Sequence, residues 1–233
     1  MKVKSKSKKI NKAWLLDHLN DTYVKLAKKE GYRARAAYKL KEIDEAFSLF
    51  KPGQLVVDLG AAPGAWSQYV RRKLVASGGV VEPGAGLAPL CGSVVAVDLL
   101  DLEPIDGVTF IQGDFRDESV LQQLQSAVRG RPVDVVISDL APNLSGIDSS
   151  DAARVEHLVE LAVDFATEHL TPTGWFVCKV FHGASFEPVV KLAKDRFRSV
   201  KTIKPKASRD RSSETFLVCA ALKTQATTVE KPC

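Results

Sequence analysis

The sequence lacks the long apolar runs and the cysteine patterns that would place a protein in a membrane or outside the cell. No uninterrupted apolar stretch approaches the ~18 residues that a membrane span requires, and the first residues form no apolar secretory segment. The four cysteines, at positions 91, 178, 219 and 233, show no C-x-x-C spacing. We therefore expect a cytoplasmic protein in a reducing setting, with no membrane partner.

Metal ligands are also sparse. The four histidines are scattered at positions 18, 157, 169 and 182, so no set of neighbouring ligands can be assembled from them. His157 and Glu160 fall on one face of a predicted helix, and solvated side chains explain that pair more simply. The sequence predicts no metal site.

Apolar residues are abundant enough to build a core. The chain has 233 residues, which at roughly 150 residues per domain gives one or two domains. Hydrophobic residues make up 45% of it, which excludes a disordered chain. We expect a soluble globular protein.

The positive charge is unevenly distributed. Lysine and arginine number 33 against 28 acids, for a net charge of +5. Six lysines precede the first acid, Asp17, and a second basic stretch covers residues 201–211. Such clusters are typical of a protein with a polyanionic partner, although a solvated terminus also explains the first ten residues.

The apolar pattern predicts helices first and then alternating strands and helices. Residues 12–31 and 34–47 show helical periodicity and end at Gly31 and at the turn 51–53. Short β-branched runs follow at 55–59, 94–99, 108–112, 133–138, 175–181 and 215–221, and the clearest helix covers 151–170. This order favours a mostly parallel sheet that is covered on both faces.

The same pattern divides the chain into parts. We expect a basic tail and helical extension at 1–50, the main domain at 51–223 and a tail at 224–233. Residues 77–92 are rich in glycine and proline and interrupt the main domain between a helix and a strand. They are predicted to form an exposed surface loop.

A glycine-rich turn marks the predicted ligand site. Residues 58–64 read D-L-G-A-A-P-G and lie between an apolar strand and a helix, where a ligand can approach the backbone of an open α/β sheet. The pyrophosphate motif G-x-G-x-x-G is missing, and Pro63 has no N–H to offer a phosphate. The turn therefore favours a nucleoside ligand without phosphates, as in an adenosylmethionine site.

Two acids at later strand ends support this interpretation. Asp98 lies 34 positions after Gly64, or 18 when the 16-residue interruption is discounted, and is placed to accept hydrogen bonds from ribose hydroxyls. Asp114 ends the next strand and is placed to receive an adenine amino group. Either acid alone is equally well explained as a cap.

At this point the chain resembles a known family. The segments Y-R-A-R at 32–35, D-L-G-A-A-P-G-A-W at 58–66, Q-G-D-F-R-D-E at 112–118, S-D-L-A-P at 138–142, K-V-F at 179–181 and S-R-D-R-S-S-E at 208–214 resemble the FtsJ-like heat-shock ribosomal RNA ribose 2′-O-methyltransferases. The resemblance implies a Rossmann-like class I methyltransferase fold with a mostly parallel seven-stranded sheet, helices on both faces and an N-terminal helical extension. It also implies an S-adenosyl-L-methionine-dependent enzyme.

The resemblance carries specific residues with it. It implies a catalytic tetrad of Lys39, Asp139, Lys179 and Glu214. It further implies a cofactor pocket built from Gly60, Ala61, Pro63, Gly64, Trp66, Asp98, Asp114 and Asp139. Three features depart from the family pattern: Ala65 replaces a glycine, Phe216 replaces a tyrosine, and the interruption at 77–92 is longer than in the bacterial members.

Transfer to a ribose hydroxyl gives each tetrad residue a chemical task. The oxygen must be held in line with the donor methyl and must lose its proton. Lys179 is the best candidate for the base or the oxygen-orienting group, and as a base it needs burial and a cationic neighbour such as Lys39. Asp139 is expected to bridge donor and lysine, and Glu214 to align the lysines.

The predicted substrate is large-subunit ribosomal RNA or the ribosomal particle, with no obligate protein partner. The resemblance points to a uridine in the aminoacyl-tRNA-binding loop, and Arg33, Arg35, Arg209 and Arg211 are expected to contact the RNA with the N-terminal lysines. Three alternatives remain: 2′-O-methylation of tRNA or an mRNA cap, an RNA-binding assembly factor without catalysis, and methylation of a base amine. The last is disfavoured because Asp139-Leu140-Ala141-Pro142 lacks the aromatic residue of that signature.

Overall fold

The computed structural model describes residues 20–75, 90–141, 148–209 and 212–223. Its centre is one seven-stranded sheet with the strand order β3-β2-β1-β4-β5-β7-β6. The strands are β1 (Leu55–Leu59), β2 (Ser93–Asp98), β3 (Val108–Gln112), β4 (Val133–Ser138), β5 (Leu170–Phe181), β6 (Phe197–Ile203) and β7 (Glu214–Leu222). The first five pair in parallel and β7 runs antiparallel to both its neighbours. The predicted fold is confirmed.

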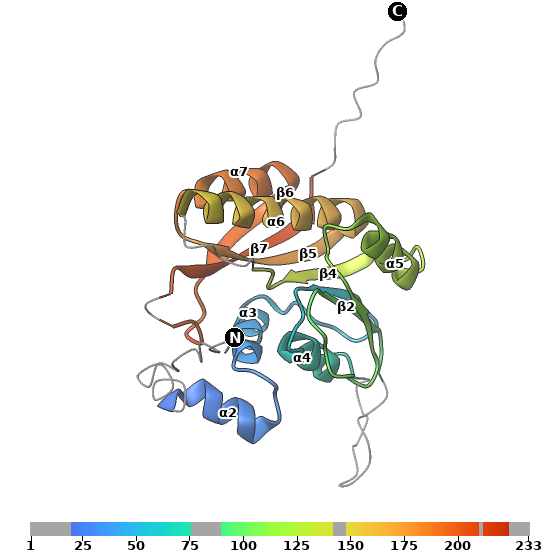
Figure 1. The fold of residues 1–233 in the computed structure, drawn as a ribbon. Helices are drawn as coiled ribbons and strands as arrows, with labels where there is room; N and C mark the ends of the chain where they lie inside the picture. The colour runs from blue at the N-terminus through green and yellow to red at the C-terminus, as the bar shows by residue number, and fades with distance from the viewer. Residues whose placement is uncertain (1–19, 76–89, 142–147, 210–211, 224–233) are drawn as a thin grey trace, which may run out of the picture.

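Helices cover both faces of this sheet (Figure 1). Helices α5 (Glu118–Val128), α6 (Asp148–His169) and α7 (Phe186–Arg196) lie on one face, and α3 (Ala36–Phe47) and α4 (Ala65–Lys73) lie on the other. Helix α2 (Thr22–Glu30) packs outside α3. None of the helices in the described ranges is both long and apolar enough to cross a membrane.

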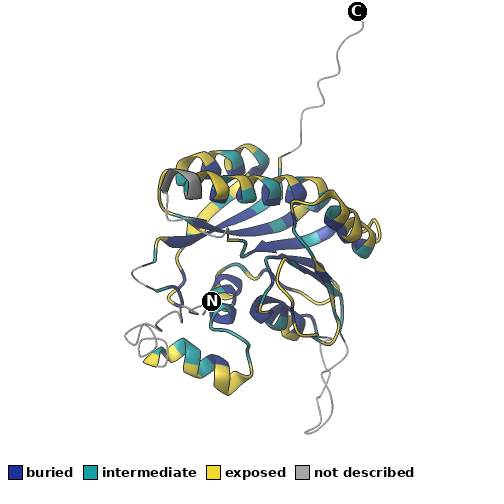
Figure 2. Cartoon of the chain, in the orientation of Figure 1, coloured by how far each residue is buried: buried dark blue, intermediate teal, exposed yellow. Residues whose placement is uncertain are grey.

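The core consists of two apolar layers separated by the sheet (Figure 2). On the α3 side, Leu40 and Ile43 pack with Val56 and Val70, so the second predicted helix of the extension belongs to the same core as the sheet. All five residues of β1 are buried, as the continuous apolar run of a central parallel strand predicts. Burial on both faces holds β1 rigidly, and the turn after it therefore has a fixed position.

Strand β6 was not among the strands predicted from the sequence. Its residues alternate in burial with a period near three rather than two, with Phe197, Val200 and Ile203 inward and Arg198, Ser199, Lys201 and Thr202 exposed. It is the edge strand beside β7, where one side of the backbone has no partner and polar residues are tolerated. The sequence pattern therefore indicated a basic, polyanion-binding stretch at these edge residues and did not indicate a strand.

Two further boundaries differ from the predictions. The expected helix 12–31 does not run unbroken, because Asp21 is extended and its carboxylate accepts hydrogen bonds from the backbone N–H of Tyr23 and Val24, as an N-cap does. The interruption at 77–92 lies mostly outside the described residues. Its end is no exposed loop, since Leu90 bridges to Val75 and the Cys91 N–H donates to the Leu74 carbonyl.

Candidate active site

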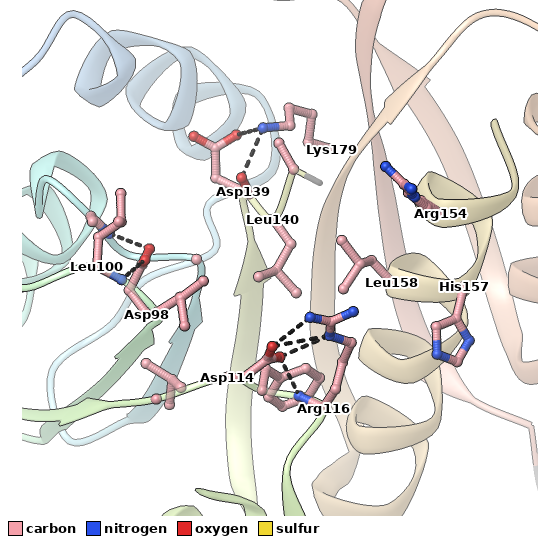
Figure 3. A pocket seen from close by; sticks show the side chains of 17 residues that line it. Asp98, Leu100, Asp114, Arg116, Asp139, Leu140, Arg154, His157, Leu158 and Lys179 are labelled. Atoms are coloured by element: carbon pink, nitrogen blue, oxygen red, sulfur yellow. Dashed lines mark hydrogen bonds and ion pairs between the residues drawn. The ribbon is translucent and has the colours of Figure 1, made fainter. Parts of the chain in front are cut away.

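A cavity of about 690 Å³ opens at the carboxyl ends of β1, β2, β3 and β4 (Figure 3). Asp98 lies on one side, Asp114 at the base, Asp139 and Lys179 at the far end, and α6 forms the opposite wall. This is the edge of an open α/β sheet where ligands bind, and the volume suits a nucleoside-sized molecule. The lining includes Gly60, Ala62, Val97, Asp98, Leu99, Leu100, Gly113, Asp114, Phe115, Arg116, Asp139, Leu140, Ala141, Arg154, His157, Leu158 and Lys179.

Gly60 brings two strand ends together beside this cavity. Its φ is 80°, and a Cβ atom there would lie 2.8 Å from the backbone nitrogen of Leu140. Any side chain would therefore push away the segment that follows β4. The glycine is needed for the close approach that sets Asp139 next to the β1 turn, as well as for access of a ligand to the backbone.

Asp98 is anchored by the main chain. Its Oδ2 accepts a hydrogen bond of 2.8 Å from the Ala62 N–H, and its Oδ1 accepts one of 2.8 Å from the Leu100 N–H. An ionised carboxylate has about four acceptor positions, so each oxygen can take another bond from a ligand hydroxyl. Asp98 therefore both fastens the β1 turn to the end of β2 and presents spare acceptors to the cavity.

Asp114 is paired with a cation. Arg116 donates from Nε to Oδ1 at 2.9 Å and from Nη2 to Oδ2 at 2.5 Å. Hydrogen bonds from Arg116 outweigh partial burial and hold the pKa of Asp114 below its usual value. The carboxylate is thus ionised at neutral pH and points into the base of the cavity (Figure 3).

Lys179 and Asp139 meet at the far end of the cavity. The Lys179 ammonium lies 2.9 Å from Asp139 Oδ1 and donates to the Asp139 carbonyl at 2.8 Å. The lysine is buried near the carboxyl end of β5, between Cys178 and Val180, whose side chains are buried in the core. A charged side chain in such a place needs partners, and Asp139 supplies two oxygens.

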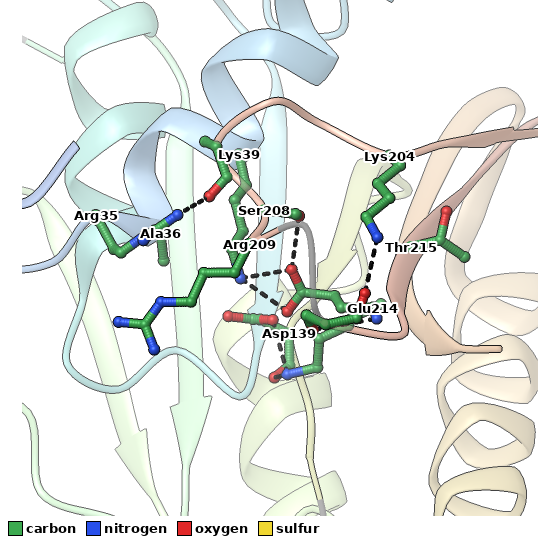
Figure 4. Close-up of polar contacts among 12 residues, drawn as sticks. Arg35, Ala36, Lys39, Asp139, Lys204, Ser208, Arg209, Glu214 and Thr215 are labelled. Carbon is green, nitrogen blue, oxygen red and sulfur yellow. Dashed lines mark hydrogen bonds and ion pairs between the residues drawn. The ribbon is translucent and has the colours of Figure 1, made fainter. Parts of the chain in front are cut away.

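Lys39 and Glu214 form the second pair of the tetrad (Figure 4). The Lys39 ammonium lies 2.6 Å and 2.7 Å from the two Glu214 oxygens, and the Ser208 hydroxyl donates to Oε1 at 2.8 Å. Burial raises the pKa of Glu214, but the Lys39 charge and the hydrogen bonds from Lys39 and Ser208 lower it to a value below the usual range. The four predicted catalytic residues therefore come together as two ion pairs from α3, β5, β7 and the end of β4.

One buried acid near the cavity has no cation. Asp58 in β1 is fully buried, and its hydrogen bond from the Ser67 hydroxyl is 2.6 Å long. Burial, more than the nearby charges of Asp139 and Asp98, raises the pKa of Asp58 to about 7. The resemblance did not single out this residue, although it opens the D-L-G-A-A-P-G turn.

Four of the predicted cofactor residues do not line the cavity. The first is Trp66, whose indole N–H donates to the Ala36 carbonyl at 2.9 Å and whose ring centroid lies 5.8 Å from that of Phe216. It is buried between α4, α3 and the sheet because helix α4 carries that face inward. Ala61, Pro63 and Gly64 belong to the same turn as Gly60 but lie outside the cavity lining.

The predicted RNA-binding arginines make contacts within the protein. Arg33 donates to three main-chain carbonyls, and Arg35 pairs with the Asp21 carboxylate and the Ala207 carbonyl. Arg209 lies 4.0 Å from the same Asp21 carboxylate. The guanidinium groups of Arg33 and Arg35 thus bind backbone and carboxylate oxygens of the protein, and their direct RNA role stays a prediction. Arg211 and the lysines at 2–12 lie outside the described residues.

Two basic residues on the cavity wall were not predicted from the sequence. Arg154 and His157 of α6 line the cavity opposite Asp98, and they stand one turn apart (Figure 3). The only available signal was their spacing on a predicted helix that follows Asp139. His157 was interpreted as a solvated partner of Glu160, and the two are in fact 4.0 Å apart with both side chains largely exposed. Among the described residues, no group of three or more His, Cys, Asp or Glu side chains is placed to hold a metal ion.

Comparisons with known proteins identify the family of this chain. The sequence model of the FtsJ-like methyltransferase family matches residues 32–222. The chain is 68% identical to ribosomal RNA large subunit methyltransferase E of Methylibium petroleiphilum, over 97% of this chain and all of that protein. It is 64% identical to the protein of the same name from Acidovorax sp. strain JS42, with the same coverage of both.

Solved structures show the same fold. A Plasmodium falciparum protein described as a ribosomal RNA methyltransferase has a TM-score of 0.67 and 26% identity, over 82% of this chain and 98% of that one. An rRNA-methylase structure from Clostridium thermocellum has a TM-score of 0.51 at 19% identity, over 79% of this chain and 97% of that one, which supports the fold alone. This chain belongs to the FtsJ-like methyltransferase family.

Proposed function

We propose that this protein transfers a methyl group from S-adenosyl-L-methionine to the 2′-hydroxyl of a ribose in large-subunit ribosomal RNA. One observation carries the proposal: two lysine–carboxylate pairs, from four separate elements, converge at the edge of a nucleoside-sized cavity. The relatives named above are called ribosomal RNA large subunit methyltransferases, which supports the substrate class. By the same resemblance, the target is a uridine in the aminoacyl-tRNA-binding loop, and the reaction takes place in the cytoplasm.

The residues of the cavity fit the methyl donor. Asp98 has spare acceptor positions for ribose hydroxyls, and Asp114 faces the base of the cavity for an adenine amino group. When bound, the donor supplies a methyl group on a cationic sulfur.

The tetrad orients the 2′-hydroxyl of the ribose or removes its proton. Lys179 projects from β5 into the cavity and is the group that orients the hydroxyl or takes its proton. Asp139 holds Lys179 from the donor side through two oxygens. Lys39 and Glu214 contact each other and position the edge of the site that lies nearest α3.

Basic side chains in the cavity lining and near the tetrad region hold the RNA. Arg154 and His157 line the wall opposite Asp98, and Lys206 is exposed beside Ser208 of the tetrad region. Phosphates are the natural partners of such side chains. This set replaces Arg33 and Arg35 in the proposal.

Two alternatives fit less well. Base-amine methylation needs an aromatic residue that stacks on the target base shortly after the acid, and Leu140 and Ala141 follow Asp139 instead. An assembly factor that only binds RNA has no need for the two ion pairs, whose burial costs desolvation free energy that the pairing does not always offset. Methylation of tRNA or an mRNA cap uses the same chemistry and differs only in substrate.

The experiment is transfer of labelled methyl groups from S-adenosyl-L-methionine to four substrates: large-subunit particles, free large-subunit RNA, tRNA and capped mRNA. We expect the highest rate on large-subunit particles or their RNA. The matched controls are Lys179→Ala, which removes the tetrad lysine, and Lys191→Ala, which removes an exposed lysine of α7 outside the cavity lining. Binding of particles without methyl transfer by the wild type contradicts the proposal and supports the assembly factor.

A further inference from the structure

Arg33 joins two loops that border the cavity. Its Nη1 donates to the Pro63 carbonyl at 3.1 Å and to the Glu103 carbonyl at 2.7 Å, and its Nη2 donates to the Pro104 carbonyl at 3.0 Å. Its own backbone N–H donates to Oε1 of Gln68 in α4 at 2.8 Å. Three main-chain oxygens from two separate segments thus surround one guanidinium group.

Both segments carry residues of the cavity. Pro63 belongs to the turn after β1, in which Gly60 and Ala62 line the cavity. Glu103 and Pro104 belong to the connection after β2, in which Leu99 and Leu100 line it. Arg33 is not part of the lining, so it fastens these two loops from outside.

Asp98 fastens the same two loops from inside. Its carboxylate accepts hydrogen bonds from Ala62 on one loop and from Leu100 on the other. The loops are therefore tied twice, once by an acid that faces the cavity and once by an arginine behind it. Displacing the outer tie changes how Ala62 and Leu100 present Asp98.

Gly64 shows that the turn is shaped around the guanidinium. A Cβ atom on Gly64 would lie 2.7 Å from Nη1 of Arg33, and the φ of this glycine is 100°. Arginine also suits the task chemically, because its planar fork offers five N–H donors whereas a lysine offers one compact ammonium. Only the guanidinium, with donors that point in several directions, can bind all three of these main-chain carbonyls at once.

We infer that Arg33 is a positioning residue for binding of the methyl donor, and that it makes no contact with RNA. The inference rests on the proposed function for the identity of the ligand. Arg33 acts by holding the β1 turn and the β2 connection at the separation that places Asp98, Leu99 and Leu100 around the nucleoside.

The test compares Arg33→Ala and Arg33→Lys with a matched control, Arg72→Ala. Arg72 tethers the same segment to α4, since it donates to the Glu30 carbonyl at 2.9 Å and stacks 4.1 Å from the Tyr32 ring centroid, but it contacts neither loop. The measurements are the dissociation constant of S-adenosyl-L-methionine by calorimetry, the kcat and KM of methylation, and the salt dependence of RNA binding.

We expect both Arg33 variants to weaken donor binding by about tenfold or more, the size typical for hydrogen bonds to a charged group. KM for the donor rises, while kcat at saturating donor stays near the wild-type value because the tetrad contacts remain. The Arg72→Ala protein binds the donor like the wild type. The salt dependence of RNA binding is the same in all three variants, since no phosphate contact is lost.

Several results overturn the inference. Wild-type donor affinity in Arg33→Lys shows that the fork is not needed, and this variant keeps the test valid if Arg33→Ala does not fold. A smaller salt dependence with unchanged donor affinity shows that Arg33 binds RNA. An equal loss in Arg72→Ala shows that only the tether to α4 matters. A wild-type protein that binds no donor overturns the proposed function and this role with it, whereas a failure confined to the Arg33 variants overturns the inference alone.

Discussion

Asp98 at one end of the cavity and the two acids of the tetrad at the other are held in different ways. At the donor end, Asp98 accepts hydrogen bonds from the backbone N–H groups of Ala62 and Leu100. At the tetrad end, Asp139 and Glu214 contact the ammonium groups of Lys179 and Lys39. Main-chain donors are fixed by the fold, whereas lysine side chains can rotate and exchange a proton or a partner.

This difference separates binding from chemistry. An acid held by backbone groups keeps the same position before and after the ligand binds, so it gives a preformed binding site. Lys179 contacts two oxygens of Asp139, and an ammonium has three donors, so a reacting hydroxyl can contact Lys179 as a further partner. Substitutions at the donor end are therefore expected to change affinity, and those at the tetrad end to change rate.

The largest effect is expected for Lys179→Ala. Removing the group that acts on the ribose oxygen lowers the single-turnover rate of methylation by about 10²–10⁴-fold, with little change in donor affinity. Lys179→Arg does not restore the rate, because a guanidinium stays protonated and cannot accept the proton. A rescued rate in Lys179→Arg would reduce the lysine to an electrostatic anchor and remove the distinction between the two ends.

A second test concerns Asp58, the buried acid without a cation. Its folded-state pKa of about 7 lies above the ordinary carboxyl value, so the folded protein binds more protons than the unfolded chain between pH 4 and 7. Its contribution to stability is therefore present below pH 4 and is lost as the pH rises toward 7.

Asp58→Asn removes this loss. Relative to the wild type, we expect the free energy of unfolding of the variant to increase by on the order of 3 kcal/mol between pH 4 and pH 7.5. The measurement is urea unfolding at both pH values, with Asp195→Asn on the exposed side of α7 as the control. A constant difference between variant and wild type at the two pH values contradicts the raised pKa.

A smaller effect is expected at the donor end. Asp98→Ala removes the spare acceptors and the inner tie between the loops, and it weakens donor binding by roughly 1.5–3 kcal/mol. The control is Asp101→Ala, since Asp101 accepts only the Leu102 N–H at 2.9 Å and does not line the cavity. Calorimetric titration of both variants decides the matter, and unchanged affinity in a folded Asp98→Ala protein refutes the assignment.

The smallest effect is expected for a single RNA contact. Lys206 is exposed and lies two residues before Ser208, which donates to Glu214, and Lys206→Ala should lower the slope of log K against log salt by about 0.7 on single-stranded RNA. Removing residues 1–10 tests the N-terminal lysines in the same assay. A slope that stays unchanged in Lys206→Ala places the RNA path elsewhere on the surface.

The sequence predicted the parts of the fold in which local pattern and burial coincide. Continuous β-branched runs marked β1 and β4 at their observed bounds, because a central parallel strand is apolar on both faces. Strand β6 was not predicted, since an edge strand needs apolar residues on only one side. The break in the helix at Asp21 was not predicted, because in the sequence an N-cap residue cannot be told from any other polar residue of a helical pattern.

For the site, the sequence predicted which residue types are present better than it predicted where their side chains point. The motif residues Asp98, Asp114, Asp139 and Lys179 all line the cavity. Trp66 and Arg33 belong to equally recognisable motifs and point elsewhere, because Trp66 packs α4 against α3 and Arg33 binds carbonyls of loops distant in sequence. A motif thus predicts which chemical group stands at a position, whereas long-range packing determines which part of the structure that group contacts.

The most direct test of the account is the chemical position of the transferred methyl group. Large-subunit particles are methylated by the wild-type protein with labelled S-adenosyl-L-methionine, and the RNA is then digested to nucleosides and separated. The account predicts label in a 2′-O-methylated nucleoside, specifically a uridine, and its disappearance with Lys179→Ala. Label on a base ring, or 2′-O-methylation that persists at the wild-type rate in Lys179→Ala, would contradict it.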